Sequence, residues 1–311
     1  LAQSGSPLAY PVLLKAARDV SYMWETTGAT ASLLNYAKVV GQSGNIKTMD
    51  KICKLIISKC DDNGTIQNKT VALDTYVSFH GINAMDDLIM AADHSNNKYR
   101  NAAIRMSLGI SGTEVVKKWI EYFPKAIPVA RPEIINMLGI RADKTALPLL
   151  TASLSDQDMN VRKESAAAIV KISGSKSIPA LIDYMMKFSD EPDQEAAKSA
   201  LMSVCGSDNI SALLPVLKSG PTAARKSVIE LLAWNKGNKF FQEVLPLAKS
   251  SEETLKMAAM EALSSLAGPD DLSKLIELLS VTDNKVYIKD IKTAIGVAAN
   301  KITVTEKRSS A

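Results

Sequence analysis

Hydrophobic residues recur along most of the chain at the three- and four-residue spacing of amphipathic helices, and these helices come in pairs. Between about residues 66 and 300, two apolar helical segments joined by a short polar turn form one repeat. The clearest first helices of a repeat lie in residues 145–154, 177–187, 210–218, 240–249 and 270–279. The sequence shows no sustained alternation of apolar and polar residues, so the pattern predicts an all-α chain.

The second helix of each repeat is followed by a residue type that tolerates a left-handed backbone. Such a residue recurs every 31 or 32 positions; we call these the cap positions: Gly81, Gly112, Asp143, Gly174, Gly206, Gly237, Gly268 and Asn300. Gly, Asn and Asp accept a positive φ at a helix C-terminus more readily than other residues do. We therefore expect all eight to end their helices in this conformation.

Two positions before each cap carry apolar or small residues and define one face of the second helix. Nine residues before the cap stand Ala72, Ala103, Ile134, Ser165, Ala197, Val228, Ala259 and Ile291. Five residues before it stand Tyr76, Ser107, Leu138, Ile169, Leu201, Leu232, Leu263 and Ile295. Because the two positions are four residues apart, they share a helix face, which we expect to be buried.

A period of 31 residues is typical of an α-solenoid. The segment DMNVRKESAAAIVKISG (158–174), with Val161-Arg162 followed by Ala166 and Ile169, resembles the second helix of a HEAT repeat, as does YRNAAIRMSLGISG (99–112). The resemblance extends over roughly residues 66–300. It implies an all-α solenoid of stacked antiparallel helix pairs, similar to HEAT and armadillo arrays. HEAT arrays serve many unrelated roles, so the resemblance implies an architecture rather than a function.

The regular repeat does not cover the ends of the chain. We expect residues 1–65 to be atypical N-terminal capping helices, 66–302 to be the HEAT-like array, and 303–311 to be a polar tail or linker. Helices are expected at 8–24, 29–41 and 45–60. The chain does not begin with Met, which indicates a fragment or a processed form, and its cellular location is not indicated.

The charge distribution bears on the class of partner. Of the net charge of +4, residues 1–60 contribute +4 and residues 301–311 contribute +2, which leaves −2 for residues 61–300. A nucleic-acid scaffold normally carries a basic stripe, so we expect no nucleic-acid binding. No stretch of about 18 apolar residues is present, so we expect no membrane insertion. The chain is expected to be a monomer.

Residues that could support catalysis are sparse. Three cysteines and two histidines form no metal-binding pattern, and Cys53, Cys60 and Cys205 are expected to be buried. HEAT-like deoxyhypusine hydroxylases bind iron through paired His-Glu motifs, and this sequence contains no His-Glu dipeptide. We therefore expect no catalytic residue, no metal and no cofactor. Two alternatives stay open: a HEAT-like enzyme acting on a nucleobase or cofactor, and a passive spacer for a neighbouring catalytic domain.

Twelve residues before the caps, six of the eight positions are basic. They are Lys69, Arg100, Arg131, Arg162, Arg225 and Lys256, with Gln194 and Ile288 at the other two. We call these six the basic series. Their regular recurrence predicts contacts with helix-end carbonyls or acids of a neighbouring repeat, rather than one ligand site.

A polar face of the second helices is the candidate binding surface. Positions eleven, seven and three before the caps point away from the buried face, and second helices line the concave side of HEAT arrays, where partners bind. The residues singled out are Lys226, Glu230, Trp234, Arg105, Lys163 and Glu195. Trp234 is the residue type most often found at binding hot spots. The sequence thus predicts a non-catalytic scaffold, one module of a larger protein, that binds a protein or peptide on its concave face.

Overall fold

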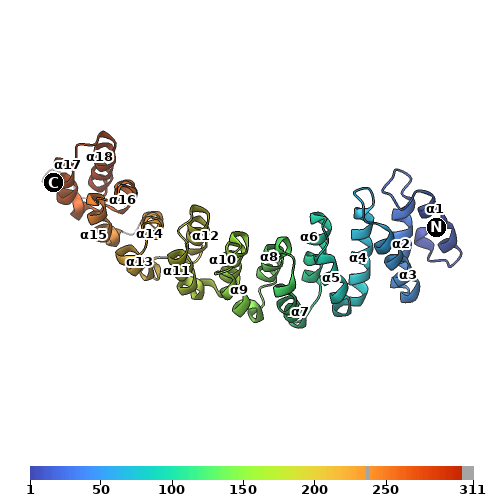
Figure 1. The fold of residues 1–311 in the computed structure, drawn as a ribbon. Helices are drawn as coiled ribbons and strands as arrows, with labels where there is room; N and C mark the ends of the chain where they lie inside the picture. Colours follow the sequence, from blue (N-terminus) through green and yellow to red (C-terminus); the bar gives the residue numbers. More distant parts are fainter. Residues whose placement is uncertain (236–237, 303–311) are drawn as a thin grey trace. The chain divides into compact units, whose positions relative to one another are not determined.

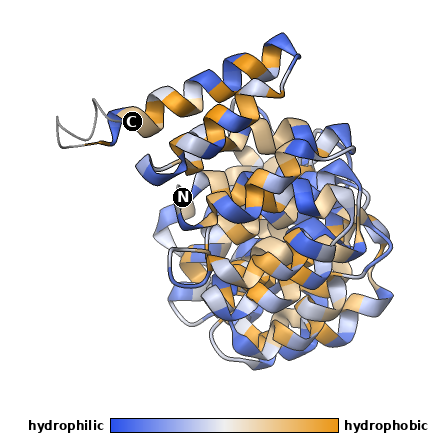
Figure 2. Ribbon diagram, turned by 90° about the vertical axis from the view of Figure 1, so that its left-hand side faces the viewer, coloured by the Kyte–Doolittle hydropathy of each residue, from blue (hydrophilic) through white to orange (hydrophobic). Residues whose placement is uncertain are grey.

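The structure, a computed structural model, is an α-solenoid of stacked helices and describes residues 1–235 and 238–302. No β-strand occurs among these residues. Cap position Gly237 and the predicted tail 303–311 lie outside them. The chain divides into two compact units, Leu1–Ala152 and Ser153–Ala311. Helices carry hydrophobic and hydrophilic residues on different faces, as Figure 2 shows.

The first compact unit stacks its helices in two rows. Its helices are α1 (Ala9–Asp19), α2 (Ala29–Gln42), α3 (Ile46–Lys59), α4 (Ile66–His80), α5 (Met85–Ala92), α6 (Asn97–Met106), α7 (Glu114–Tyr122) and α8 (Arg131–Arg141), with α9 (Leu147–Ser153) at the division. The even-numbered helices α2, α4, α6 and α8 pack successively against one another (Figure 1). These are the second helices of the repeats from α4 onward, and their first helices form the other row.

The second compact unit repeats this arrangement. Its helices are α10 (Met159–Ser173), α11 (Ile178–Lys187), α12 (Glu191–Met202), α13 (Leu214–Ser219), α14 (Thr222–Trp234), α15 (Phe241–Val244), α16 (Glu253–Leu266), α17 (Leu272–Ser280) and α18 (Lys285–Asn300). Successive even-numbered helices from α10 to α18 pack against one another, and α11, α13 and α17 each pack against the even-numbered helix that follows. The second helices α12, α14, α16 and α18 are thus each held by neighbours of their own row and by their own first helix.

Many first helices begin with a turn of 3-10 helix, which the apolar pattern does not reveal. Lys144–Ala146 precedes α9, Ile210–Leu213 precedes α13, and Pro269–Asp271 precedes α17. Such turns are frequent at helix N-termini because they tighten the first hydrogen-bonded turn. In segment 240–249, α15 is followed by 3-10 helix at Leu245–Lys249, so the α-helix expected there is largely replaced.

The predicted buried face of the second helices is confirmed. All eight residues nine positions before a cap have a relative exposure of 0%. Seven of the eight residues five positions before a cap are buried as well, and Ile295 is the exception with an intermediate exposure. Small residues such as Ala72 and Ala197 at the first position let neighbouring even-numbered helices approach closely.

The prediction that every cap position ends a helix with a positive φ is only partly right. Gly81 (φ 52°) and Gly174 (φ 54°) directly follow α4 and α10. Gly112 has φ 96° but lies beyond the 3-10 turn Ser107–Gly109 that follows α6, so it does not itself end a helix. The prediction is wrong for four others: Asp143, Gly206, Gly268 and Asn300.

The reason for this difference is that several second helices end early or late. Ala142, not Asp143, takes the left-handed conformation after α8 (φ 56°), and the Asp143 side chain instead accepts a hydrogen bond from Thr145 N at 2.9 Å. Gly268 likewise begins the following 3-10 turn, with φ −111°. Asn300 is the last residue of α18. At these positions the recurring residue serves the start of the next turn or the helix itself.

The helices expected in residues 1–65 are present as α1, α2 and α3. α3 begins at the N-cap Asn45, whose side chain accepts a hydrogen bond from Thr48 N. α2 also packs against α4, so the even-numbered row extends into this segment. Its predicted role as a capping element, with a boundary at residue 65, stays a prediction.

Candidate partner-binding site

The six predicted partner-binding residues all lie on even-numbered helices. They are Arg105 on α6, Lys163 on α10, Glu195 on α12, and Lys226, Glu230 and Trp234 on α14. Arg105, Lys163 and Glu195 are exposed, Lys226 and Glu230 are half-buried, and Trp234 is 47% exposed. The register argument therefore placed them correctly on the surface, and their role in binding a partner stays a prediction.

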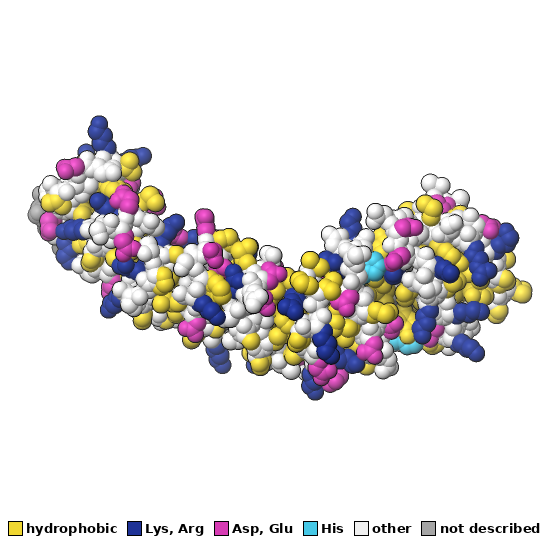
Figure 3. Space-filling model, in the orientation of Figure 1, with side chains coloured by type: hydrophobic (Ala, Val, Ile, Leu, Met, Phe, Trp, Pro, Cys, Tyr) yellow, Lys and Arg dark blue, Asp and Glu magenta, His cyan; other side chains and the backbone are white. Residues whose placement is uncertain are grey.

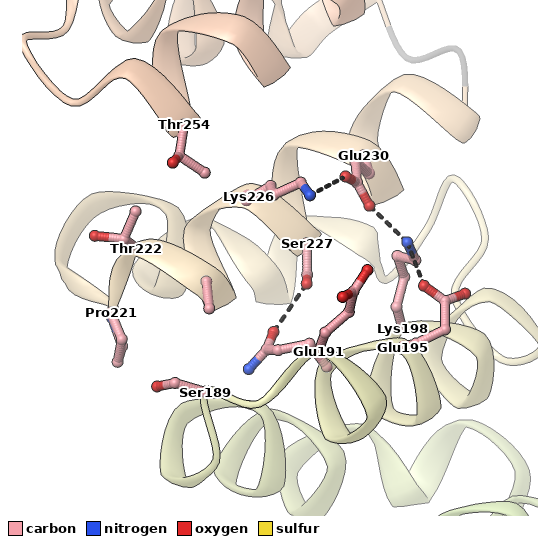
Figure 4. Close-up of a pocket in the computed structure, with 12 residues that line it drawn as sticks. Ser189, Glu191, Glu195, Lys198, Pro221, Thr222, Lys226, Ser227, Glu230 and Thr254 are labelled. Atoms are coloured by element: carbon pink, nitrogen blue, oxygen red, sulfur yellow. Dashed lines mark hydrogen bonds and ion pairs between the residues drawn. The ribbon is translucent and has the colours of Figure 1, made fainter.

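Three of these residues line one hollow of about 660 Å³ in the second compact unit. It lies between α12 and α14 and reaches Thr254 on α16, as Figure 4 shows. The lining comprises Ser189, Glu191, Gln194, Glu195, Lys198, Pro221, Thr222, Ala223, Lys226, Ser227, Glu230 and Thr254. Trp234 follows Glu230 by one helical turn on α14 and is outside this lining.

Alternating charges link α12 to α14 along one wall of the hollow (Figure 4). Lys198 Nζ lies 2.7 Å from Glu195 Oε2 and 2.6 Å from Glu230 Oε2, and Lys226 Nζ lies 3.7 Å from Glu230 Oε1. Burial lowers the pKa of Lys198, but the hydrogen bonds to Glu195 and Glu230 outweigh it and raise that pKa above its usual value. Lys198 therefore stays charged and holds both carboxylates in place.

Lys198 is the residue at the centre of this wall that sequence reasoning missed. It stands eight positions before cap Gly206, off the register of the predicted polar face. A usable signal was its spacing of three residues after Glu195, which allows an ion pair on one helix. The contact with Glu230 joins two helices, so the sequence of either helix alone could not predict it.

The floor of the hollow is polar and fully paired. Gln194 Nε2 donates to the carbonyls of Met185 and Phe188, each at 2.6 Å, and Ser227 Oγ donates to Gln194 Oε1 at 2.8 Å. Gln194 stands at the position where most other repeats carry a basic residue. Its amide group pairs the carbonyls at the C-terminal end of α11. The charged groups open to a ligand are thus those at the rim, among them the exposed Glu191.

The structure does not bring the other two predicted residues into this hollow. Arg105 lines a separate hollow of about 550 Å³ in the first compact unit, together with Asn101 and Glu133. Lys163 stands exposed on α10. The hollow between α12 and α14 therefore contains only some of the residues predicted for the polar face of the second helices.

Three members of the basic series contact an acid of the neighbouring repeat, as predicted. Arg100 Nε donates to Glu133 at 2.9 Å, Arg162 Nε to Asp193 at 3.0 Å, and Arg225 Nη1 to Glu252 at 3.3 Å. Each of these arginines also donates to a backbone carbonyl: His94 O, Asp156 O and Leu217 O, respectively. The guanidinium thus joins an acid of the next repeat to a turn of its own repeat.

The remaining members of the series use other acceptors. Lys69 Nζ lies 2.6 Å from Asp61, and Arg131 donates to the carbonyls of Ala126 and Pro124. Lys256 Nζ lies 5.3 Å from the centroid of the Tyr287 ring, a cation–π contact. The six side chains are thus distributed along the repeats rather than gathered at one pocket.

The contact between Arg162 and Asp193 is part of a buried cluster. Asp193 is 1% exposed and Arg162 is 7% exposed, and Tyr184 Oη donates to Asp193 Oδ1 at 2.5 Å. Burial alone raises the pKa of Asp193, but the hydrogen bonds from Arg162 and Tyr184 outweigh it and lower the pKa below its usual value. Burial, with the bond to Asp193, raises the pKa of Tyr184. The carboxylate is ionised and the phenol neutral at pH 7.

The three cysteines are buried and free, as expected. Burial raises the pKa of Cys53 to about 12 and the pKa values of Cys60 and Cys205 to about 11. Because the thiolate is the reactive form, we expect all three to resist iodoacetamide at pH 8 in the native protein and to react once it is unfolded. Intact mass measured over time tests this expectation. Alkylation of the native chain at the rate of an exposed thiol would contradict it.

Within residues 1–235 and 238–302, no group of three or more His, Cys, Asp and Glu residues is placed to hold a metal ion. His80 Nε2 lies 2.6 Å from Asp50, and His94 Nε2 lies 2.7 Å from Asp61, so each histidine faces one carboxylate. Among the helices of the same residues, none is both long and apolar enough to cross a membrane.

The comparison with known protein families agrees with the fold. A family model for HEAT repeats matches residues 116–202 and 210–295. The structure is similar to human deoxyhypusine hydroxylase in complex with glycerol, at 16% identity and a TM-score of 0.34, over 81% of this chain and 97% of that one. It is also similar to two engineered proteins. The first has 15% identity and a TM-score of 0.37, over 96% of this chain and 92% of that one. The second has 14% identity and a TM-score of 0.20, over 86% of this chain and 97% of that one. No curated protein matches the sequence.

The matched segments span more than half of the chain, and the chain belongs to the HEAT-repeat family. The predicted family and the predicted all-α solenoid are therefore confirmed. The family defines a helical repeat scaffold.

Proposed function

We propose that this chain is a non-catalytic scaffold that binds a protein or peptide partner on the exposed face of its even-numbered helices. The observation that carries this proposal is the hollow of about 660 Å³ between α12 and α14. Its rim offers charged and hydroxyl side chains, and α14 adds the exposed Trp234 one turn further along. Such a combination of a polar rim and an aromatic side chain suits recognition of a polypeptide.

The charge arrangement supports recognition rather than reaction. Glu195 and Glu230 are held in ion pairs with Lys198, so neither is free to act as a general base. Glu191 also lines the hollow but stands exposed at its rim. These features favour the scaffold over an enzyme acting on a nucleobase or cofactor. The presence of a built hollow favours it over a passive spacer.

Nucleic acid is an unsuitable partner for this surface. On the face that Figure 3 shows, Lys and Arg side chains are interspersed with Asp and Glu side chains in each compact unit. Counterion release from phosphates requires several unopposed cations together. A salt-dependent affinity for duplex DNA would speak against the proposal.

Trp234→Ala is expected to separate binding from packing. Since Trp234 is 47% exposed, the variant should unfold at nearly the wild-type temperature, while its affinity for a partner should fall by about 2 kcal/mol or more. If Trp234 were instead a packing residue, the same change would lower the free energy of unfolding by roughly 3–5 kcal/mol. Thermal unfolding of the variant decides between these roles before any partner is known.

Peptides selected from a random library displayed on phage can serve as test ligands in place of the partner protein. Peptides selected on the full chain should bind more weakly, in titration calorimetry, to Trp234→Ala and to the charge-exchanged variant Lys226→Glu/Glu230→Lys. Val129→Ser, an exposed apolar position on the first compact unit, serves as the control and should change nothing. Peptides that bind all variants equally would remove this hollow from the proposal.

A further inference from the structure

The loop between α1 and α2 presents two exposed apolar side chains from an unusual backbone. Ser21 and Tyr22 both have positive φ, 51° and 58°, a conformation that residues with a Cβ rarely adopt. Directly after them, Met23 is 49% exposed and Trp24 is 57% exposed. The loop is thus shaped to place these side chains at the surface.

Contacts with α4 and the turn before it fix this loop. Asn68 on α4, which is fully buried, donates through Nδ2 to the carbonyl of Tyr22 at 2.9 Å. Trp24 N donates to the carbonyl of Gly64 at 3.2 Å. The Oδ1 atom of Asn68 has no hydrogen-bond partner among the described residues, although buried acceptors are normally paired. The backbone that carries Trp24 is therefore anchored rather than free.

Beside the loop, a hollow of about 220 Å³ lies between α2 and α4. Its lining includes the buried Leu34 of α2 and the buried Asn68 and Thr75 of α4. The 57% exposed Trp24 and the 41% exposed Val71 also line it. Pockets that bind whole small molecules usually measure about 300–1,000 Å³. The volume here suits a single apolar side chain.

Two charges stand on opposite walls of this hollow. Lys38 on α2 and Asp74 on α4 both line it, and both are exposed. Neither has an ion-pair partner within the part of the chain that the structure describes. The α2 wall therefore favours an acidic group on a ligand, and the α4 wall favours a basic one.

We propose that the hollow between α2 and α4 is a second docking site, which takes a peptide segment of a partner protein with one large apolar residue between an acidic and a basic residue. The apolar side chain enters beside Trp24 and Val71, its acidic neighbour pairs with Lys38, and its basic neighbour pairs with Asp74. This site lies wholly in the first compact unit and shares no residue with the hollow between α12 and α14.

An array of synthetic peptides tests the proposal with a defined probe. Each peptide carries a central Leu, Met or Phe and flanking Asp, Glu, Lys, Arg or Gly in every order, and the full-length chain carries a fluorescent label. We expect binding to peptides with opposite charges on the two flanks and in one order only. Trp24→Ala should weaken this binding by about 30-fold, the loss typical of a hot-spot residue.

Control variants distinguish specific recognition at the hollow from non-specific binding through exposed apolar side chains. Met90→Ala removes an apolar side chain that is 68% exposed on α5 and should leave binding unchanged. The double variant Lys38→Glu/Asp74→Lys should prefer the opposite order of flanking charges. Circular dichroism of each variant confirms that the helices are retained.

Three outcomes would overturn the proposal. The first is equal binding of all charge orders, and the second is equal binding by wild type and Trp24→Ala. The third is self-association of the wild-type chain in analytical ultracentrifugation that Trp24→Ala abolishes, because a second copy would then occupy the hollow. None of these results bears on the Trp234 experiment, so the two proposals fail separately.

Discussion

Replacing Asp193 by Ala is expected to lower the free energy of unfolding by about 3–5 kcal/mol, the usual cost of breaking a buried ion pair. The change leaves the Arg162 guanidinium, 7% exposed, without its carboxylate, and the Tyr184 hydroxyl without its acceptor. Desolvation of an unpaired charge is the main cost, and the contacts of Arg162 with the carbonyls of Asp156 and Gln157 only partly offset it. Urea unfolding monitored by circular dichroism measures the loss.

A matched ion pair in the same series provides the control. Glu252 is exposed and accepts from Arg225 at 3.3 Å, so Glu252→Gln should change the free energy of unfolding by no more than about 1 kcal/mol. Equal losses in the two variants would show that burial is not the cause. A further variant, Arg162→Met/Asp193→Leu, should recover much of the stability that Asp193→Ala loses, because no charge is left buried.

The same cluster predicts a pH dependence. The folded-state pKa of Asp193 lies below its unfolded value of about 3.9, so its stabilising contribution is present above that pH and is lost as pH falls through the folded pKa. The wild type should therefore lose stability below about pH 4 more steeply than Asp193→Ala. Parallel curves for the two proteins would contradict the assignment.

Trp119→Ala is expected to cost about 3–5 kcal/mol of unfolding free energy, as large truncations in a packed core do. The indole is 0% exposed on α7, and its Nε1 donates to Ser107 Oγ at 2.8 Å, a residue that is also fully buried. The variant leaves both a cavity and an unsatisfied hydroxyl. Thermal and urea unfolding measure the total effect.

Hydrogen exchange locates the damage. α7 packs against α5, so protection in these two helices should fall before protection in α2, because a stacked repeat is stabilised chiefly by its neighbours. Trp119→Phe, which keeps most of the apolar volume and loses the bond to Ser107, should cost about 1–3 kcal/mol. Uniform loss of protection over the first compact unit would contradict nearest-neighbour behaviour.

The repeat period predicted the parts of the fold that depend on burial. All residues nine positions before a cap, from Ala72 to Ile291, are fully buried because each must face a neighbouring helix of the same row. The period did not predict how individual helices end. Asp143 caps the following turn, and Ala142 takes the left-handed conformation in its place, a choice made by local hydrogen bonds.

The candidate site was predictable only where it follows the helix register. Glu195, Lys226 and Glu230 were found from that register, and they line one hollow. Lys198 was missed because its role depends on a contact with Glu230, 32 residues away, which no single-helix pattern contains. The anchored position of Trp24 depends on a loop with two positive-φ residues, and the sequence there gives no turn signature.

The sequence positions of the acids that pair with the arginines limit how the repeats can be rearranged during evolution. Glu133 lies ten residues before its cap, Asp193 thirteen, and Glu252 sixteen, although Arg100, Arg162 and Arg225 share one register. If recombination moved a repeat to another place in the chain, its arginine would face a neighbouring repeat whose acid stands at a different position relative to the cap. The two side chains would then not lie opposite each other. At the junction where Arg162 meets the buried Asp193, such a rearrangement would be costly, so the neighbour of that repeat is specified by this pair.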